Sequence, residues 1–107
     1  MSNRSILPMA LVTLLIAPGC ALAADPFVGK DHYQHHCAQC HGLEGKAGLP
    51  RGPDFTRKSD PGNGLMRSDS VLLTRIRQGG IGCPSFRGVL DDLQILDVVS
   101  FLRSMKR

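Results

Sequence analysis

The stretch "CAQCH", residues 37–41, decides the fold of this 107-residue chain. Its two cysteines stand three positions apart, so one helical turn brings both thiols to the same side of a helix. His41 follows directly and projects an imidazole from that turn. Thiols and an imidazole at this spacing can serve a covalently attached haem, a thioredoxin-like redox pair, a zinc site, or a structural disulfide beside an incidental histidine.

The first two dozen residues have the pattern of an export signal. A single charge at Arg4 precedes an apolar run from Ile6 to Ala17 that is broken only by Thr13, and small residues follow. This run is shorter than the ~18 apolar residues that a membrane-spanning helix needs. The sequence therefore predicts export and no membrane span.

The cleavage position follows from the small residues. Ala21 and Ala23 suit the minus-three and minus-one positions, so we expect residues 1–23 to be a cleaved signal peptide and residues 24–107 to be one mature domain. A weaker alternative is a lipoprotein signal that ends at Cys20, which would then carry a lipid anchor.

The composition indicates a core that the chain cannot complete alone. A mature chain of 84 residues buries only ~60–65% of its unfolded surface. Trp is absent and aromatic residues are few, which suggests that a flat apolar group from outside the chain fills the middle. The formal charge of +4 is mild and scattered, without a basic run among aromatics, so no nucleic-acid partner is predicted. The aromatic residues are Tyr33, Phe27, Phe55, Phe86 and Phe101.

A c-type haem attachment site fits these observations best, because C-x-x-C-H behind an export signal is typical of one. Cys37 and Cys40 can each add across a haem vinyl group, and His41 can then bind the iron as proximal ligand. A thioredoxin-like pair would need a βαβ pattern, which the sequence lacks. A zinc site made of Cys37, Cys40, His41 and Cys83 would leave the core unfilled, and a plain disulfide would leave His41 without a role.

Capping residues predict two helices early in the mature chain. The first begins after Asp25 as N-cap, continues through Cys40 and ends at Gly42. The second begins after Ser68 and ends at Gly79. The segment between them is rich in Gly, Pro and charge and is expected to be an ordered loop.

A third helix begins at "DDLQ", where Asp91 and Gln94 have capping-box spacing. Its apolar residues recur at helical spacing, and no segment shows sustained two-residue alternation. The predicted fold class is therefore all-α with long loops. The apolar stripe consists of Ile95, Val98, Val99 and Leu102.

The mature chain resembles a small class I monohaem cytochrome c of the bacterial periplasmic kind. The resemblance covers a helix ending in "CAQCH", the "GPDF" loop (52–55), a helix followed by "GG", the "PSF" segment (84–86) and the final helix. It implies three main helices and long loops wrapped around one covalent haem c with its iron. It also implies single-electron transfer between redox protein partners, a donor dehydrogenase and a terminal acceptor, and no catalysis by the chain itself.

Two structural roles follow from the resemblance. The Pro53 carbonyl would accept a hydrogen bond from the His41 imidazole and orient this ligand, although Pro53 could also merely stiffen its loop. Gly29 would let the first helix cross the last near Phe101 and Leu102.

At the position before "PSF", where the family usually has the methionine that binds the iron on its distal side, this sequence has Cys83. A thiolate ligand would stabilise Fe(III), lower the reduction potential and explain an unpaired cysteine in an exported chain. Cys83 could instead fill space, or form a disulfide with Cys20 or with a second chain. Met66 is the alternative iron ligand, and Met105 is expected at the surface or the edge of the core.

Other candidate residues have weaker support. His32, His35 and His36 share the helix that carries the thiols, so we expect them at the surface or, for His32, against a loop. Arg75 and Arg77 could pair with a haem propionate, but a solvated helix face is the simpler interpretation.

The predicted function is periplasmic electron transfer through an exposed haem edge, with Lys46, Arg51 and Arg87 as a weak positive rim for docking. One alternative is a small haem subunit of an enzyme that oxidises thiosulfate-type sulfur compounds, since such enzymes have haem with His/Cys ligation. Another is a redox- or gas-sensing haem module. Thiosulfate turnover by the isolated chain would favour the former alternative, and carbon monoxide binding by the reduced protein would favour the latter.

Overall fold

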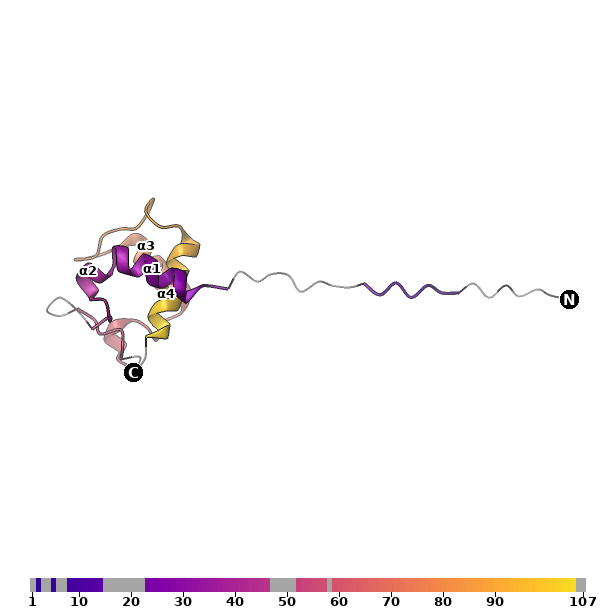
Figure 1. Cartoon of the computed structure of the whole chain (residues 1–107), viewed down its shortest axis with the longest axis horizontal. Coiled ribbons are helices and arrows are strands. Elements are labelled where there is room, and N and C mark those ends of the chain that lie inside the picture. The colour runs from indigo at the N-terminus through magenta and orange to yellow at the C-terminus, as the bar shows by residue number, and fades with distance from the viewer. Residues whose placement is uncertain are drawn as a thin grey trace.

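Four α-helices form the domain in the computed structural model, which describes residues 2, 5, 8–14, 23–46, 52–57 and 59–105 (Figure 1). The described residues contain an isolated bridge between Gly80 and Cys83 but no strand, which confirms the predicted all-α class. The helices are α1 (Pro26–His36), α2 (Ala38–His41), α3 (Asp69–Gln78) and α4 (Asp92–Ser104), and a 3₁₀ turn spans Pro61–Asn63.

Each long helix begins where its capping residue predicts. The Asp25 carboxylate accepts hydrogen bonds from the Phe27 and Val28 amides at the start of α1. Ser68 caps α3. At the start of α4 the capping box is complete: the Asp91 carboxylate accepts from the Gln94 amide at 2.8 Å, and the Gln94 side chain accepts from the Asp91 amide at 2.9 Å.

The prediction of one continuous helix through Cys40 is wrong. The first helix ends at His36, and Cys37 adopts φ −120°, ψ −35°, which is outside the helical range. The single turn α2 follows and ends at Gly42, whose φ of 78° favours glycine. Residues 37–41, which the sequence predicts to be the attachment segment, therefore form a separate turn that needs contacts of its own to be held in place.

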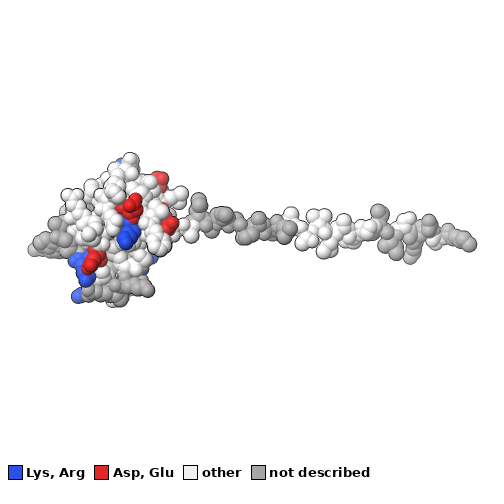
Figure 2. All heavy atoms as spheres, in the orientation of Figure 1, with Lys and Arg blue, Asp and Glu red and all other residues white. Residues whose placement is uncertain are grey.

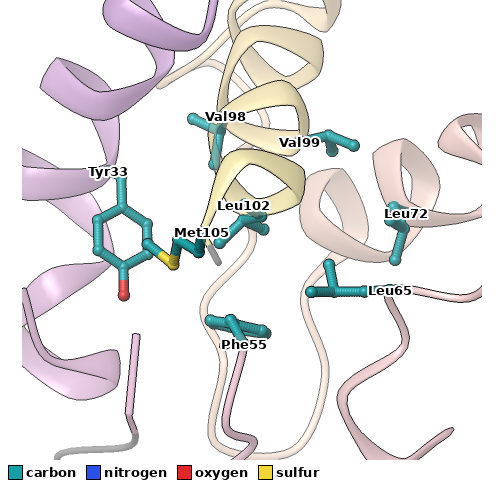
Figure 3. Close-up of a cluster of buried hydrophobic side chains, with 8 residues drawn as sticks. All are labelled: Tyr33, Phe55, Leu65, Leu72, Val98, Val99, Leu102 and Met105. Atoms are coloured by element: carbon teal, nitrogen blue, oxygen red, sulfur yellow. The ribbon is translucent and has the colours of Figure 1, made fainter. Parts of the chain in front are cut away.

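The buried apolar side chains form two clusters. Figure 3 shows the larger cluster, in which Tyr33 of α1, Phe55 of the following loop and Leu72 of α3 surround residues of α4. Its members are Tyr33, Phe55, Leu65, Leu72, Val98, Val99, Leu102 and Met105. The smaller cluster consists of Phe86, Leu90 and Ile95, and the partly buried Ile76 packs against both.

The α4 stripe is buried as predicted, but the expectation for Met105 is wrong. Met105 is only 9% exposed and belongs to the larger cluster, beside Tyr33 in Figure 3. A Cβ added at Gly45 would lie 2.5 Å from its sulfur, so this glycine makes room for the side chain. The turn after α2 and the end of α4 are thereby packed together.

The packing of α1 against α4 depends on Gly29. A Cβ added there would lie 1.8 Å from the Asp97 carbonyl oxygen and 2.9 Å from the Val98 nitrogen. The close approach is thus one turn earlier in α4 than predicted. The ring of Phe101 instead meets Tyr33, with centroids 5.2 Å apart and a tilt of 59°.

The described part of the predicted signal segment contributes nothing to this core. Residues 8–14 form no helix, and Leu11 and Val12 are 86% and 84% exposed. Among the described residues, no helix is long and apolar enough to cross a membrane. The predictions for Arg4 and Cys20 concern residues outside the described ranges.

Candidate functional site

The thiols and the imidazole of residues 37–41 lie on one turn. The amides of Cys40 and His41 both donate to the Cys37 carbonyl, at 3.2 and 2.9 Å. Cys37 is half-buried at the break between α1 and α2 and packs against the larger cluster, whereas Cys40 is exposed. The segment therefore presents one thiol toward the core and one toward the surface.

The His41 side chain has the character of a metal ligand. Burial lowers the pKa of this imidazole from its ordinary value of 6.5, which favours the neutral form that binds metals. Its ring lies 4.9 Å from the Phe55 ring, centroid to centroid. Its Nδ1 is buried without a hydrogen-bond partner. An orphaned polar atom of this kind is costly, so a buried imidazole that offers a ring nitrogen to a metal is consistent with this position, provided that its other nitrogen finds a hydrogen-bond partner.

Pro53 lies half-buried in the loop that presents Phe55 to this ring. The hydrogen bonds of the described residues include none from His41 to the Pro53 carbonyl. What ties the loop here is the Phe55 amide, which donates to the Gly45 carbonyl at 2.8 Å. The orienting role of Pro53 stays a prediction.

The structure brings the Cys83 segment to the end of α1, because Phe86 lies against His36 with ring centroids 6.0 Å apart. Burial, and then the neighbouring thiols of Cys83 and Cys40, raise the pKa of Cys37 to about 11. Cys83 is half-buried and packs against the smaller cluster. Cys37 and Cys83 thus stand at the edges of different clusters, where an attached apolar group could contact both.

A tight turn holds the Cys83 backbone. The Gly80 amide donates to the Cys83 carbonyl at 2.9 Å, and the Cys83 amide donates back to Gly80 at 3.1 Å. Before this turn, Gly79 has φ 71°, and a Cβ there would lie 2.6 Å from the Ser85 nitrogen and 2.7 Å from the Cys83 carbonyl oxygen. Gly79, the first glycine of the "GG" after α3, is therefore a steric requirement of the turn.

The residues after Cys83 are tied back to α3. The Arg77 carbonyl accepts from the Ser85 hydroxyl at 2.9 Å and from the Phe86 amide at 3.3 Å. The Arg77 side chain donates to both carboxylate oxygens of Asp92, each at 2.9 Å. Sequence reasoning missed these ties, because only the fold brings Arg77 to the start of α4. They also place the Arg77 guanidinium in an ion pair with Asp92, where the sequence predicts a solvated helix face.

Met66, the alternative iron ligand predicted from the sequence, lies at the surface. Its side chain is 70% exposed. The Arg103 guanidinium bonds the carbonyls on either side of it, at 2.6 Å for Leu65 and 2.8 Å for Arg67, and also contacts Asp69 at 2.7 Å. These bonds hold the backbone on both sides of Met66.

The three other histidines remain on α1. His35 and His36 are exposed, as expected, and His32 is half-buried. The His36 ring meets the Phe86 ring edge-on, with centroids 6.0 Å apart. His35 hydrogen-bonds the Asp31 carbonyl of its own helix.

The proposed positive rim is weak. Lys46 lies 3.4 Å from the carboxylate of Glu44, and Arg87 is exposed. The Arg75 guanidinium lies against Gly80, 3.0 Å from where a Cβ would be. Arg51 is outside the described ranges. Figure 2 shows one face of the molecule, on which basic and acidic groups of the described residues lie side by side without a patch of one sign.

Comparison with known proteins matches nearly all of the helical domain. The model of a protein family described as cytochrome c oxidase, cbb3-type, subunit III, matches residues 24–102, which include the attachment turn and Cys83. Cytochrome c6 from Nostoc sp. (strain PCC 7120 / SAG 25.82 / UTEX 2576) is 30% identical over 97 residues, or 91% of this chain and 85% of that protein.

Proposed function

This chain belongs to the c-type cytochrome family, and from that premise we propose that it is a periplasmic monohaem electron carrier whose iron is bound by His41 and Cys83. The family holds haem c covalently, carries electrons and works with redox protein partners. The finer proposal concerns which residues attach the haem, which bind the iron, and where the protein acts.

The observation that carries the proposal is the donor set on one turn. Cys37 and Cys40 would attach the haem as thioethers, and His41 would bind the iron through its neutral, half-buried imidazole. When bound, haem c supplies a one-electron couple between Fe(III) and Fe(II). Phe55 lies against the imidazole and limits the orientations that its ring can take.

Cys83 would supply the sixth ligand from the fixed turn after α3. The turn presents Cys83 from the edge of the smaller cluster, and its thiol is an electrostatic neighbour of Cys37. An anionic thiolate favours Fe(III), so the reduction potential would be low compared with that of a methionine-bound haem. The exposure of Met66 supports the same assignment.

The periplasmic location rests on the first 23 residues. The exposed apolar residues of the described segment 8–14 find no place in the domain, as expected of a segment that is removed. The family match begins at residue 24, directly after the proposed cleavage position. Mass spectrometry of the exported protein would distinguish a chain that begins at Ala24 from one anchored through Cys20.

The ligand assignment is tested by optical and electron paramagnetic resonance spectra of the ferric holoprotein. We expect a low-spin thiolate signature that Cys83→Ala abolishes and that the matched variant Met66→Leu leaves intact. Cys83→Met should raise the reduction potential by a sizeable part of the ~0.8 V that axial ligands span in haem proteins. A wild-type signature that survives in Cys83→Ala would assign the iron to another donor and reduce Cys83 to a packing role.

A further inference from the structure

Tyr33 bonds both ends of the attachment segment. Its backbone carbonyl accepts a hydrogen bond from the Cys37 amide at 2.8 Å, where the segment begins. Its side-chain hydroxyl donates to the Gly42 carbonyl at 2.6 Å, directly after His41. Tyr33 is therefore the residue that joins α1 to both limits of α2.

The position of Tyr33 is itself fixed by the core. The side chain is 1% exposed, and its ring packs against Phe101 of α4. Figure 3 shows Tyr33 facing Met105 at the end of the same helix. A displacement of the hydroxyl would require the α1 and α4 packing to move with it, so the bond to Gly42 transmits the rigidity of the core to the segment.

The attachment turn needs this support. A single turn such as α2 is unstable by itself, because nucleating a helix orders several residues for few hydrogen bonds. The break at Cys37 also separates α2 from the hydrogen-bond ladder of α1. The last carbonyls of a helix lack intrahelical donors, and the Tyr33 hydroxyl supplies one at Gly42.

We propose that Tyr33 is a positioning residue for the haem iron: its hydroxyl fixes the turn that carries Cys40 and His41 and thereby sets the orientation of the His41 imidazole. This inference rests on the proposed function, in which His41 binds the iron. Tyr33 acts through Gly42 and need not touch the haem. Phe55, whose ring lies tilted by 44° against the imidazole, would then restrain a ring whose backbone is already fixed.

The test uses ferric holoprotein and the hyperfine-shifted proton resonances of the haem methyl groups, whose spread depends on the orientation of the axial imidazole. Tyr33→Phe removes one hydroxyl and keeps the buried ring. Ser104→Ala is the matched control, because the Ser104 hydroxyl also donates to a backbone carbonyl at 2.6 Å, but on the exposed side of α4. Tyr33→Phe should lower the folding equilibrium constant about three- to tenfold, the worth of one hydrogen bond, whereas Ser104→Ala should change it little, because its hydroxyl is exposed and bonds its own helix.

We expect Tyr33→Phe to change the haem methyl spread and Ser104→Ala to leave it unchanged. The chain has one tyrosine, so 3-fluorotyrosine labelling alters Tyr33 alone, and this label should retain the wild-type spread because it keeps the donor. If Tyr33→Phe and wild type give equal haem methyl spectra, the role of Tyr33 is refuted while the proposed function stands. The same holds if 3-fluorotyrosine changes the methyl spread as much as Tyr33→Phe does. If the wild-type spectrum lacks the resonances of an iron-bound His41, the proposed function is refuted as well.

Discussion

Replacing Gly29 by alanine should force α1 and α4 apart. The new Cβ would meet the Asp97 carbonyl oxygen at 1.8 Å and its carbon at 2.3 Å, where ordinary contact begins at 3.4 Å. These are backbone atoms and cannot rotate away. Overpacking of this kind costs ~1–3 kcal/mol, and here it moves two whole helices, while alanine gains ~1 kcal/mol of helix propensity over glycine. Because backbone atoms must move, we take the upper end of that range and expect a net loss of about 2 kcal/mol in the free energy of unfolding.

The assay is denaturant unfolding of the holoprotein, followed by far-ultraviolet circular dichroism and by haem absorbance. Gln34 is exposed on the same helix, so the difference between Gln34→Gly and Gln34→Ala measures propensity without a packing term. If Gly29→Ala stabilises the protein by this same difference, α1 and α4 do not touch at Gly29, and the reasoning is refuted.

Three further changes test other contacts by the same unfolding assay. Gly79→Ala should destabilise the protein by ~2 kcal/mol or more, because its φ of 71° and its contact with the Ser85 nitrogen both exclude a Cβ; a neutral result would contradict the tight turn. Arg103→Lys should lose ~1–2 kcal/mol, because lysine cannot bond Leu65, Arg67 and Asp69 together; full stability would mean that these bonds contribute little. Burial, with a smaller effect of Cys37, raises the pKa of Tyr33 from 10.0 to about 12. The folded state therefore holds a proton that the unfolded state releases, so the free energy of unfolding should fall by ~2–3 kcal/mol as the pH rises through this range, and this slope should be absent in Tyr33→Phe.

The helices could be predicted because their signals are local. Asp25, Ser68 and Asp91 each bond amides two or three residues ahead, so the sequence window that contains the cap also contains its partners. The all-α class follows from these caps and from the absence of alternating segments.

The break in the first helix and the place of Met105 were not predictable in this way. Cys37 leaves the helical conformation in a segment whose composition favours helix, and the contact that holds α2 in place comes from the Tyr33 hydroxyl. Met105 is buried because Gly45, sixty positions earlier in the chain, leaves room for its sulfur. Both outcomes depend on partners that only the fold brings together.

The candidate site likewise has a part that local sequence signals predict and a part that depends on the fold. The spacing of Cys37, Cys40 and His41 predicts one turn with three donors, because a helix fixes that geometry locally. The spacing does not choose between Cys83 and Met66 as a further ligand, because both stand in loops with glycine nearby. The structure adds that Met66 is 70% exposed and Cys83 half-buried, a difference that depends on the packing of residues far apart in the sequence.

The divided core explains why the two attachment cysteines are unequal. The larger and smaller clusters share Ile76 but have Cys37 and Cys83 at their separate edges. An apolar group attached at this junction would contact both clusters and join them into one core. Such a group would supply the apolar surface that the few aromatic residues of this chain do not. Cys37 would contribute packing as well as a bond there, because it is half-buried against the larger cluster. Cys40 is exposed and would contribute its bond alone, so both thioethers would attach the group but only Cys37 would add to the stability of the core.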